Sequence, residues 1–110
     1  MNYQHQTLAS GKWFTMTLAE QMANIGSEVE RTISWYKKGD KKYWQSAFDR
    51  ALELIDLTVS DTRYKHRLKE ILRTREVLCD LFYGNNTYHI KYPELQKYFL
   101  EFGIWARQDR

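Results

Sequence analysis

The chain has 110 residues, of which 43% are hydrophobic and 28% charged, and this composition excludes an intrinsically disordered protein. Five glycines and one proline argue against a loop-rich or all-β fold, and one cysteine excludes an internal disulfide or a cysteine-based zinc site. The net charge of +3 suits nucleic acid or an acidic protein as partner. Because no secretory signal pattern and no membrane-length apolar run occurs, we expect a cytoplasmic protein without a membrane partner.

The first segment of the chain is polar and aperiodic, and predicts a flexible N-terminal arm over residues 1–13. A single domain is expected over residues 14–110. Apolar residues then recur at three- and four-residue spacing from Leu18 to Tyr36, which predicts an amphipathic helix over residues 17–38.

Local signals mark both ends of this first helix. Thr17 and Glu20 fit a capping box, and Gly39 follows two lysines as a C-terminal stop. Gly26 lies on the apolar stripe, where a glycine costs about 1 kcal/mol relative to alanine. We expect the close approach of a neighbouring helix at this position, in preference to a hinge.

Three further helices follow in the sequence. Wide apolar stripes predict helices over residues 41–60 and 62–83, with Ser60 or Asp61 as the cap between them. Pro93 suits the first turn of a last helix that extends to about residue 107. Since the links between the first three helices are very short, the sequence predicts an all-α, antiparallel up-down four-helix bundle.

Basic side chains gather at the first and second links between helices. The cluster at the first link contains Lys37, Lys38, Lys41 and Lys42. The cluster at the second link and along the third helix contains Arg63, Lys65, Arg67, Lys69 and Arg73. Up-down topology places the two links at opposite ends of the bundle. Such clusters bind nucleic acid through its phosphates, and the nearby rings Tyr36, Tyr43, Trp44 and Tyr64 suit unpaired bases.

Solvation and pairing between helices are the alternative explanation of these charges. The expected pairs join acidic residues of the second helix to basic residues of the third: Asp49, Glu53 and Asp56 to Lys69, Arg73 and His66. Lysines beside a helix C-terminus are also simply favourable. Arg75 interrupts the apolar stripe of the third helix, so we expect it in a buried ion pair with Glu53 or Glu30.

The sequence contains no constellation typical of an enzyme. It has no Glu-x-x-His pair for a di-iron site and no glycine-rich phosphate loop. Cys79 lies on a core stripe, which favours an inert buried thiol over a nucleophile, and His66 with Glu70 is too few ligands for a metal site. We therefore expect no catalytic residues, no metal and no cofactor.

Four segments carry a resemblance to small bacterial proteins that are uncharacterised. They are SEVERTISW (27–35), RALELIDLT (50–58), RLKEILRTREVLCDLF (67–82) and YFLEFGIWAR (98–107). In size, basic charge and helix order, the chain over residues 17–107 resembles the four-helix-bundle group of ribosomal-RNA intervening-sequence proteins and the accessory proteins of diversity-generating retroelements. The resemblance implies a basic, ring-forming bundle, with a role in binding RNA and a reverse transcriptase in the retroelement case.

Two functions are therefore predicted. The first is a non-enzymatic helical bundle that binds nucleic acid, RNA ahead of DNA, as an accessory or structural factor, with both basic clusters as contact areas. The second is a protein-interaction module or homo-oligomeric adaptor that uses the aromatic face of the last helix. Tyr98, Phe102 and Trp105 would be the anchors of that interface, although these rings could instead simply close the bundle core.

Overall fold

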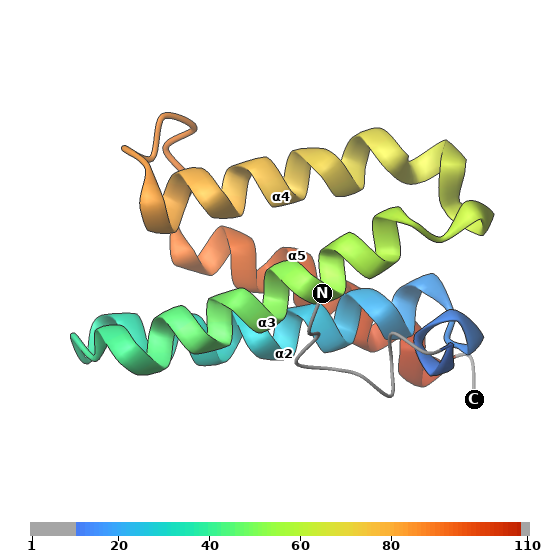
Figure 1. Ribbon diagram of the computed structural model, residues 1–110, viewed down its shortest axis with the longest axis horizontal. Helices are drawn as coiled ribbons and strands as arrows, with labels where there is room; N and C mark the ends of the chain where they lie inside the picture. The colour runs from blue at the N-terminus through green and yellow to red at the C-terminus, as the bar shows by residue number, and fades with distance from the viewer. Residues whose placement is uncertain (1–10, 109–110) are drawn as a thin grey trace.

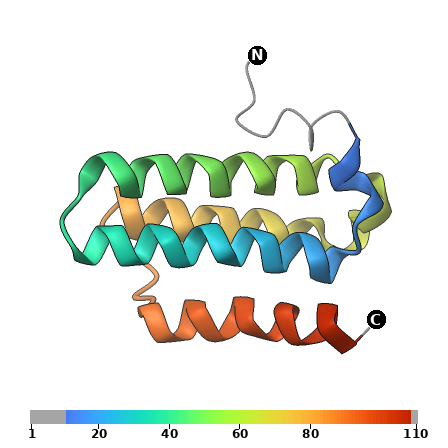
Figure 2. The ribbon, with the colours of Figure 1, turned by 90° about the horizontal axis from the view of Figure 1, so that it is seen from below.

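The computed structural model describes residues 11–108 and shows, over that range, four long helices that form a bundle (Figure 1). The elements are η1 (Lys12–Thr15), α2 (Leu18–Lys37), α3 (Lys41–Val59), η2 (Thr62–Arg67), α4 (Leu68–Tyr83) and α5 (Tyr92–Gln108), where η marks a 3-10 helix. Consecutive long helices run in opposite directions, so the predicted all-α, up-down bundle is confirmed. Helix α2 lies between α3 and α5, and α4 lies on the far side of this layer in Figure 2.

Helix α2 forms because its apolar side chains fall on one face and its first turn is capped. Met22, Ile25, Val29 and Ile33 are almost completely buried against the other helices. The predicted capping box is present: the Glu20 amide donates to Thr17 Oγ1 (3.1 Å), and the Thr17 amide donates to Glu20 Oε1 (3.0 Å). The two bonds satisfy amides that a helix start would otherwise leave unpaired.

Helices α2 and α5 approach each other closely at Gly26. A Cβ atom on this residue would lie 2.7 Å from the Cβ atom of Phe99, which is nearer than carbon atoms approach in proteins. The expectation that Gly26 admits a neighbouring helix is therefore confirmed. Phe99 is itself buried and fills the space that the missing side chain leaves.

The domain begins before the predicted boundary at residue 14. Trp13 has no exposed surface, and its indole nitrogen donates to Thr58 Oγ1 on α3 (3.0 Å). Its carbonyl oxygen accepts from Gln21 Nε2 (2.9 Å). Lys12 and Trp13 thus belong to η1, and the prediction of an arm through residue 13 is wrong for these two residues. Gly11 of the predicted arm is the N-cap of η1, and residues 1–10 lie outside the described residues.

The single helix predicted over residues 62–83 is divided in the structure into η2 and α4. Tyr64 has non-helical backbone angles (φ −114°, ψ 30°), and η2 contributes no buried residue, so packing does not hold it in an α-helical conformation. Asp61 is the cap of this segment, since its Oδ1 atom accepts from the Arg63 amide (3.1 Å). The break turns the chain so that α4 crosses back over α3.

Candidate nucleic-acid interface

A tight turn between α2 and α3 gathers the first basic cluster at one end of the bundle. We call Lys37, Lys38, Lys41 and Lys42 the turn lysines; all of them are exposed. Gly39 closes the turn in a left-handed conformation (φ 73°), which glycine adopts without strain. The Asp40 carboxylate caps α3 by accepting from the Tyr43 amide (3.3 Å).

The turn lysines do not all have the same electrostatic environment. Lys37 lies in the last turn of α2, where a positive charge is favoured by the helix dipole. Lys41 and Lys42 are the first two residues of α3, where the dipole disfavours positive charge, and the first turn contains no acidic residue. The Asp40 cap offsets only part of this charge. Their position is therefore not explained by the stability of the helix.

Two of the turn lysines contact aromatic rings. The Lys37 ammonium lies 5.3 Å from the centre of the Tyr92 ring, and the Lys38 ammonium lies 4.7 Å from the centre of the Trp35 ring. Cation–π contacts of exposed side chains stabilise by about 0.5–1 kcal/mol, so both ammonium groups can still bind an anion. A lysine side chain that already contacts a ring also loses little further conformational entropy when it binds an anion.

The second basic cluster begins with an arginine that has a structural role. The Arg63 guanidinium donates to both carboxylate oxygens of Asp61, with Nη2 2.7 Å from Oδ2 and Nε 3.0 Å from Oδ1. Its Nη2 also donates to the carbonyl oxygen of Met16 (2.8 Å). Asp61 is only 6% exposed, and the hydrogen bonds from Arg63 hold the pKa of its carboxyl group below the ordinary value. Arg63 thus fastens η2 to the segment before α2.

The other members of the second cluster differ in the contacts that they make within the protein. Arg67 forms an ion pair with Glu70, with Nε 2.7 Å from Oε2, and its guanidinium lies 5.9 Å from the centre of the Phe102 ring. The Arg73 guanidinium lies over the Tyr88 ring at 4.6 Å. By contrast, Lys65 and Lys69 are exposed.

Arginine and lysine have separate roles in this protein. Within residues 11–108, every carboxylate ion pair uses an arginine: Arg31 and Arg50 with Glu28, Arg63 with Asp61, Arg67 with Glu70, and Arg75 with Asp56. No lysine of this range takes part in one. The lysines of this range, together with Arg73 and Arg107, are therefore the cations without an ion pair, and they remain available to an external anion.

The ion pairs between α3 and α4 differ from those expected. Arg75 Nε lies 2.9 Å from Asp56 Oδ1, so its partner is neither Glu53 nor Glu30. The two side chains are 38% and 56% exposed, so the pair is not buried and contributes about 1 kcal/mol or less to stability. The hydrogen bond that Arg75 donates to Asp56 raises the pKa of Arg75. The sequence predicts a pair of Asp56 with Lys69, Arg73 or His66, but in the structure Asp56 pairs with Arg75.

Aromatic rings surround the same end of the bundle as the turn lysines. Trp44 lies at their centre, with ring centroids 5.1 Å from Tyr36 and 5.3 Å from Tyr83. On the neighbouring side, Trp35 and Tyr43 form a stacked pair with centroids 4.7 Å apart. Tyr36, Tyr43 and Tyr83 are 39%, 52% and 54% exposed. Lysines and accessible rings therefore occur together at this end.

The rings that were predicted as an interface on the last helix have different environments. Phe102 is 4% exposed, so it belongs to the core. Tyr98 is half-buried, and its hydroxyl group lies 3.3 Å from both Thr74 Oγ1 and Glu70 Oε1. Burial raises the pKa of Tyr98. Trp105 is 49% exposed, and it is the ring of the three that remains accessible to a partner.

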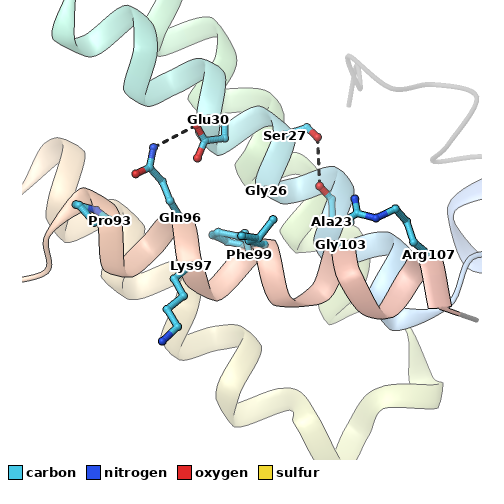
Figure 3. A pocket seen from close by; sticks show the side chains of 11 residues that line it. Ala23, Gly26, Ser27, Glu30, Pro93, Gln96, Lys97, Phe99, Gly103 and Arg107 are labelled. Carbon is cyan, nitrogen blue, oxygen red and sulfur yellow. Dashed lines mark hydrogen bonds between the residues drawn. The ribbon is translucent and has the colours of Figure 1, made fainter.

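A shallow groove of about 650 Å³ runs between α2 and α5 (Figure 3). Small residues line part of it, among them Ala23, Ser27 and Gly103. Towards the α2–α3 turn, Gln96 Nε2 donates to Glu30 Oε2 (3.2 Å) across the groove. A second hollow of about 370 Å³ shares these two residues and is lined further along by Lys37 and Lys38. The groove thus leads towards the turn lysines.

The side chains that could bind a metal ion or act as a nucleophile lie apart from one another within residues 11–108. No group of three or more His, Cys, Asp or Glu side chains in this range could hold a metal ion. Cys79 is half-buried, and burial raises the pKa of its thiol, which lowers its fraction of reactive thiolate. Each helix in the described range is too short or too polar to cross a lipid bilayer.

Comparisons with protein-family models, curated proteins and solved structures find no match to this chain. The resemblance to small basic bacterial bundles therefore stays a prediction.

Proposed function

We propose that the protein binds nucleic acid, RNA ahead of DNA, as a non-enzymatic accessory or structural factor. The observation that carries this proposal is the position of Lys41 and Lys42 at the N-terminus of α3. A positive side chain at the N-terminus of a helix is unfavourable by about 0.3–1 kcal/mol, because the helix dipole is positive at this end. No carboxylate within residues 11–108 forms an ion pair with Lys41 or Lys42. A phosphate backbone would supply the missing negative charge.

The turn lysines are the principal contact area in this proposal. The lysines of the second cluster, Lys65 and Lys69, form an additional area at the opposite end, about 30 Å away along a helix of this length. Arg63 and Arg67 contribute less than their charge suggests, because their guanidinium groups already bind Asp61 and Glu70.

The test measures fluorescence anisotropy of labelled RNA and DNA oligonucleotides, single-stranded and duplex, over a series of salt concentrations. The variant is the double substitution Lys41→Gln and Lys42→Gln. The control is Lys12→Gln with Lys97→Gln, which removes the same charge from exposed lysines outside both clusters. Reversal of Arg63 or Arg67 is unsuitable, because it would break internal ion pairs.

We expect the Lys41/Lys42 variant to bind roughly tenfold more weakly at near-physiological salt, and its salt slope to fall by about two, since two phosphate contacts are lost. The Lys12/Lys97 control should bind as the unmodified protein does. Equal losses in both variants would point to a net-charge effect, and absence of binding by the unmodified protein at low salt would refute the proposal.

A protein-interaction role is the second candidate, and a specific observation favours it. Leu100, Ile104 and Trp105 on α5 are 56%, 38% and 49% exposed, and large exposed apolar side chains on one helix are typical of an interface. Light scattering over a range of protein concentrations tests the homo-oligomer version. A monomer at every concentration would leave only a foreign partner for this face.

A further inference from the structure

The stacked pair of Trp35 and Tyr43 differs from the contacts that the exposed Tyr36 and Tyr83 make with Trp44 at the α2–α3 end. Its rings are inclined by only 26° with centroids 4.7 Å apart, whereas Tyr36 meets Trp44 at 66° and Tyr83 meets Trp44 at 49°. Trp35 supports one face of the Tyr43 ring, and no other ring within residues 11–108 contacts Tyr43. Tyr43 is 52% exposed, so part of its surface remains free for a further contact.

The other exposed tyrosines at this end are held by two rings each. Tyr83 contacts both Trp44 and Phe48 at 5.3–5.4 Å, and Tyr36 contacts both Trp44 and Phe82 at 5.1–5.5 Å. Neither ring is part of a parallel stack. Two other stacks, Trp44 with Phe82 and Phe82 with Tyr92, consist of buried or half-buried rings. Tyr43 is therefore the exposed ring of this end that can extend an existing stack by one further flat group.

Positive charge lies near the stack that contains Tyr43. Lys41 and Lys42 directly precede it on α3, and the Lys38 ammonium lies 4.7 Å from the centre of the Trp35 ring in the same stack. The long side chains of the exposed Lys41 and Lys42 are thus close enough along the chain to reach the phosphates of a flat group bound to Tyr43. An unpaired nucleobase attached to its phosphates has this combination of a flat aromatic face and adjoining negative charge.

We propose that Tyr43 is a stacking platform for an unpaired base, and that the α2–α3 end consequently selects single-stranded over duplex nucleic acid. This inference rests on the proposed function and deepens it. Bases inside a duplex are already stacked on their neighbours, so a duplex could use the turn lysines but not the Tyr43 ring.

The test compares Tyr43→Leu with the control Tyr83→Leu, which removes an equally exposed tyrosine (54%) from outside the stack. Three labelled ligands of equal length are titrated by fluorescence anisotropy: an oligouridylate, an abasic ribose–phosphate oligomer and an RNA duplex. The abasic oligomer keeps the phosphates and lacks the bases, so it separates stacking from charge. Circular dichroism and urea denaturation confirm that each variant is folded.

We expect Tyr43→Leu to weaken oligouridylate binding by about 5- to 150-fold, the loss that follows removal of one base–aromatic stack. Its affinity for the abasic oligomer and for the duplex should be unchanged, and Tyr83→Leu should bind all three ligands normally. Tyr43→Phe keeps the ring and should restore binding of oligouridylate, which excludes a role of the hydroxyl group.

Several results would overturn the inference. An equal loss for the oligouridylate and the abasic oligomer would show that Tyr43 does not act through a base. Unchanged oligouridylate binding in Tyr43→Leu would remove the platform and leave the proposed function standing if the lysine substitutions still weaken binding. If the unmodified protein binds none of the three ligands, both the platform and the proposed function are refuted.

Discussion

Substitution of Gly26 by alanine would test whether the contact between α2 and α5 determines the stability of the bundle. Alanine is a better helix former than glycine by about 1 kcal/mol, so propensity alone predicts stabilisation. In the structure, however, the new Cβ atom would lie 2.7 Å from Phe99 Cβ and 3.1 Å from Phe99 Cγ. An ordinary carbon–carbon contact is about 3.8 Å, so the two helices must separate by about 1 Å.

The cost of this separation can be estimated from overpacked cores. Such substitutions cost about 1–3 kcal/mol, and the upper end applies here because the opposing Cβ atom is attached directly to the α5 backbone. After the gain in helix propensity, Gly26→Ala should destabilise the protein by about 2 kcal/mol, which lowers the melting temperature by about 10 °C.

Gly103→Ala is the matched control. Gly103 also lies inside a helix, but a Cβ atom there would meet nothing nearer than Arg107 Nη1 at 3.9 Å. This variant should be more stable than the unmodified protein by up to about 1 kcal/mol. Urea denaturation followed by circular dichroism measures both variants, and equal stabilities for the two would refute the argument from helix contact.

Three further predictions concern other parts of the bundle. The pKa of Asp61 is lowered from 3.8 in the folded state, so its stabilisation is complete above about pH 4 and is lost as the pH falls further; the difference in unfolding free energy between the unmodified protein and Asp61→Asn should therefore shrink in acid urea titrations. Trp13→Phe should cost about 2–3 kcal/mol in urea denaturation, because it removes the hydrogen bond to Thr58 and leaves a cavity. Trp105→Ser should cost about 1–2 kcal/mol of unfolding free energy, since half of this ring is buried and it packs on Phe102, and should also reduce any self-association that light scattering detects.

Helix boundaries were predictable wherever neighbouring residues specify them. The capping box of Thr17 and Glu20, the left-handed Gly39 and the Asp61 cap each act within a few residues, so the sequence displays them directly. The division of the third helix was not predictable in this way. Thr62 to Arg67 resembles the start of a helix, but it buries no residue, and burial depends on the whole fold.

Long-range partners were predicted less well, for a related reason. Trp13 lies in a polar, aperiodic stretch, and its partner Thr58 is 45 residues away, so only the closed bundle shows that the indole is buried. Arg75 was assigned the wrong carboxylate because the rotation of α3 about its axis decides whether Asp56 or Glu53 faces it. The topology correctly predicts that the two basic clusters lie at opposite ends of the bundle. It does not predict which cations of the clusters form ion pairs within the protein.

The division between arginine ion pairs and unpaired lysines has a chemical consequence. Acetylation neutralises the lysine ε-amine and leaves the guanidinium group unchanged. At the turn lysines it would disturb only the contacts of Lys37 with Tyr92 and of Lys38 with Trp35, and every ion pair within residues 11–108 would persist. An acetyltransferase or a mild acylating reagent could therefore discharge this end of the molecule while the bundle stays folded, so that its affinity for an anionic partner is adjustable independently of its stability.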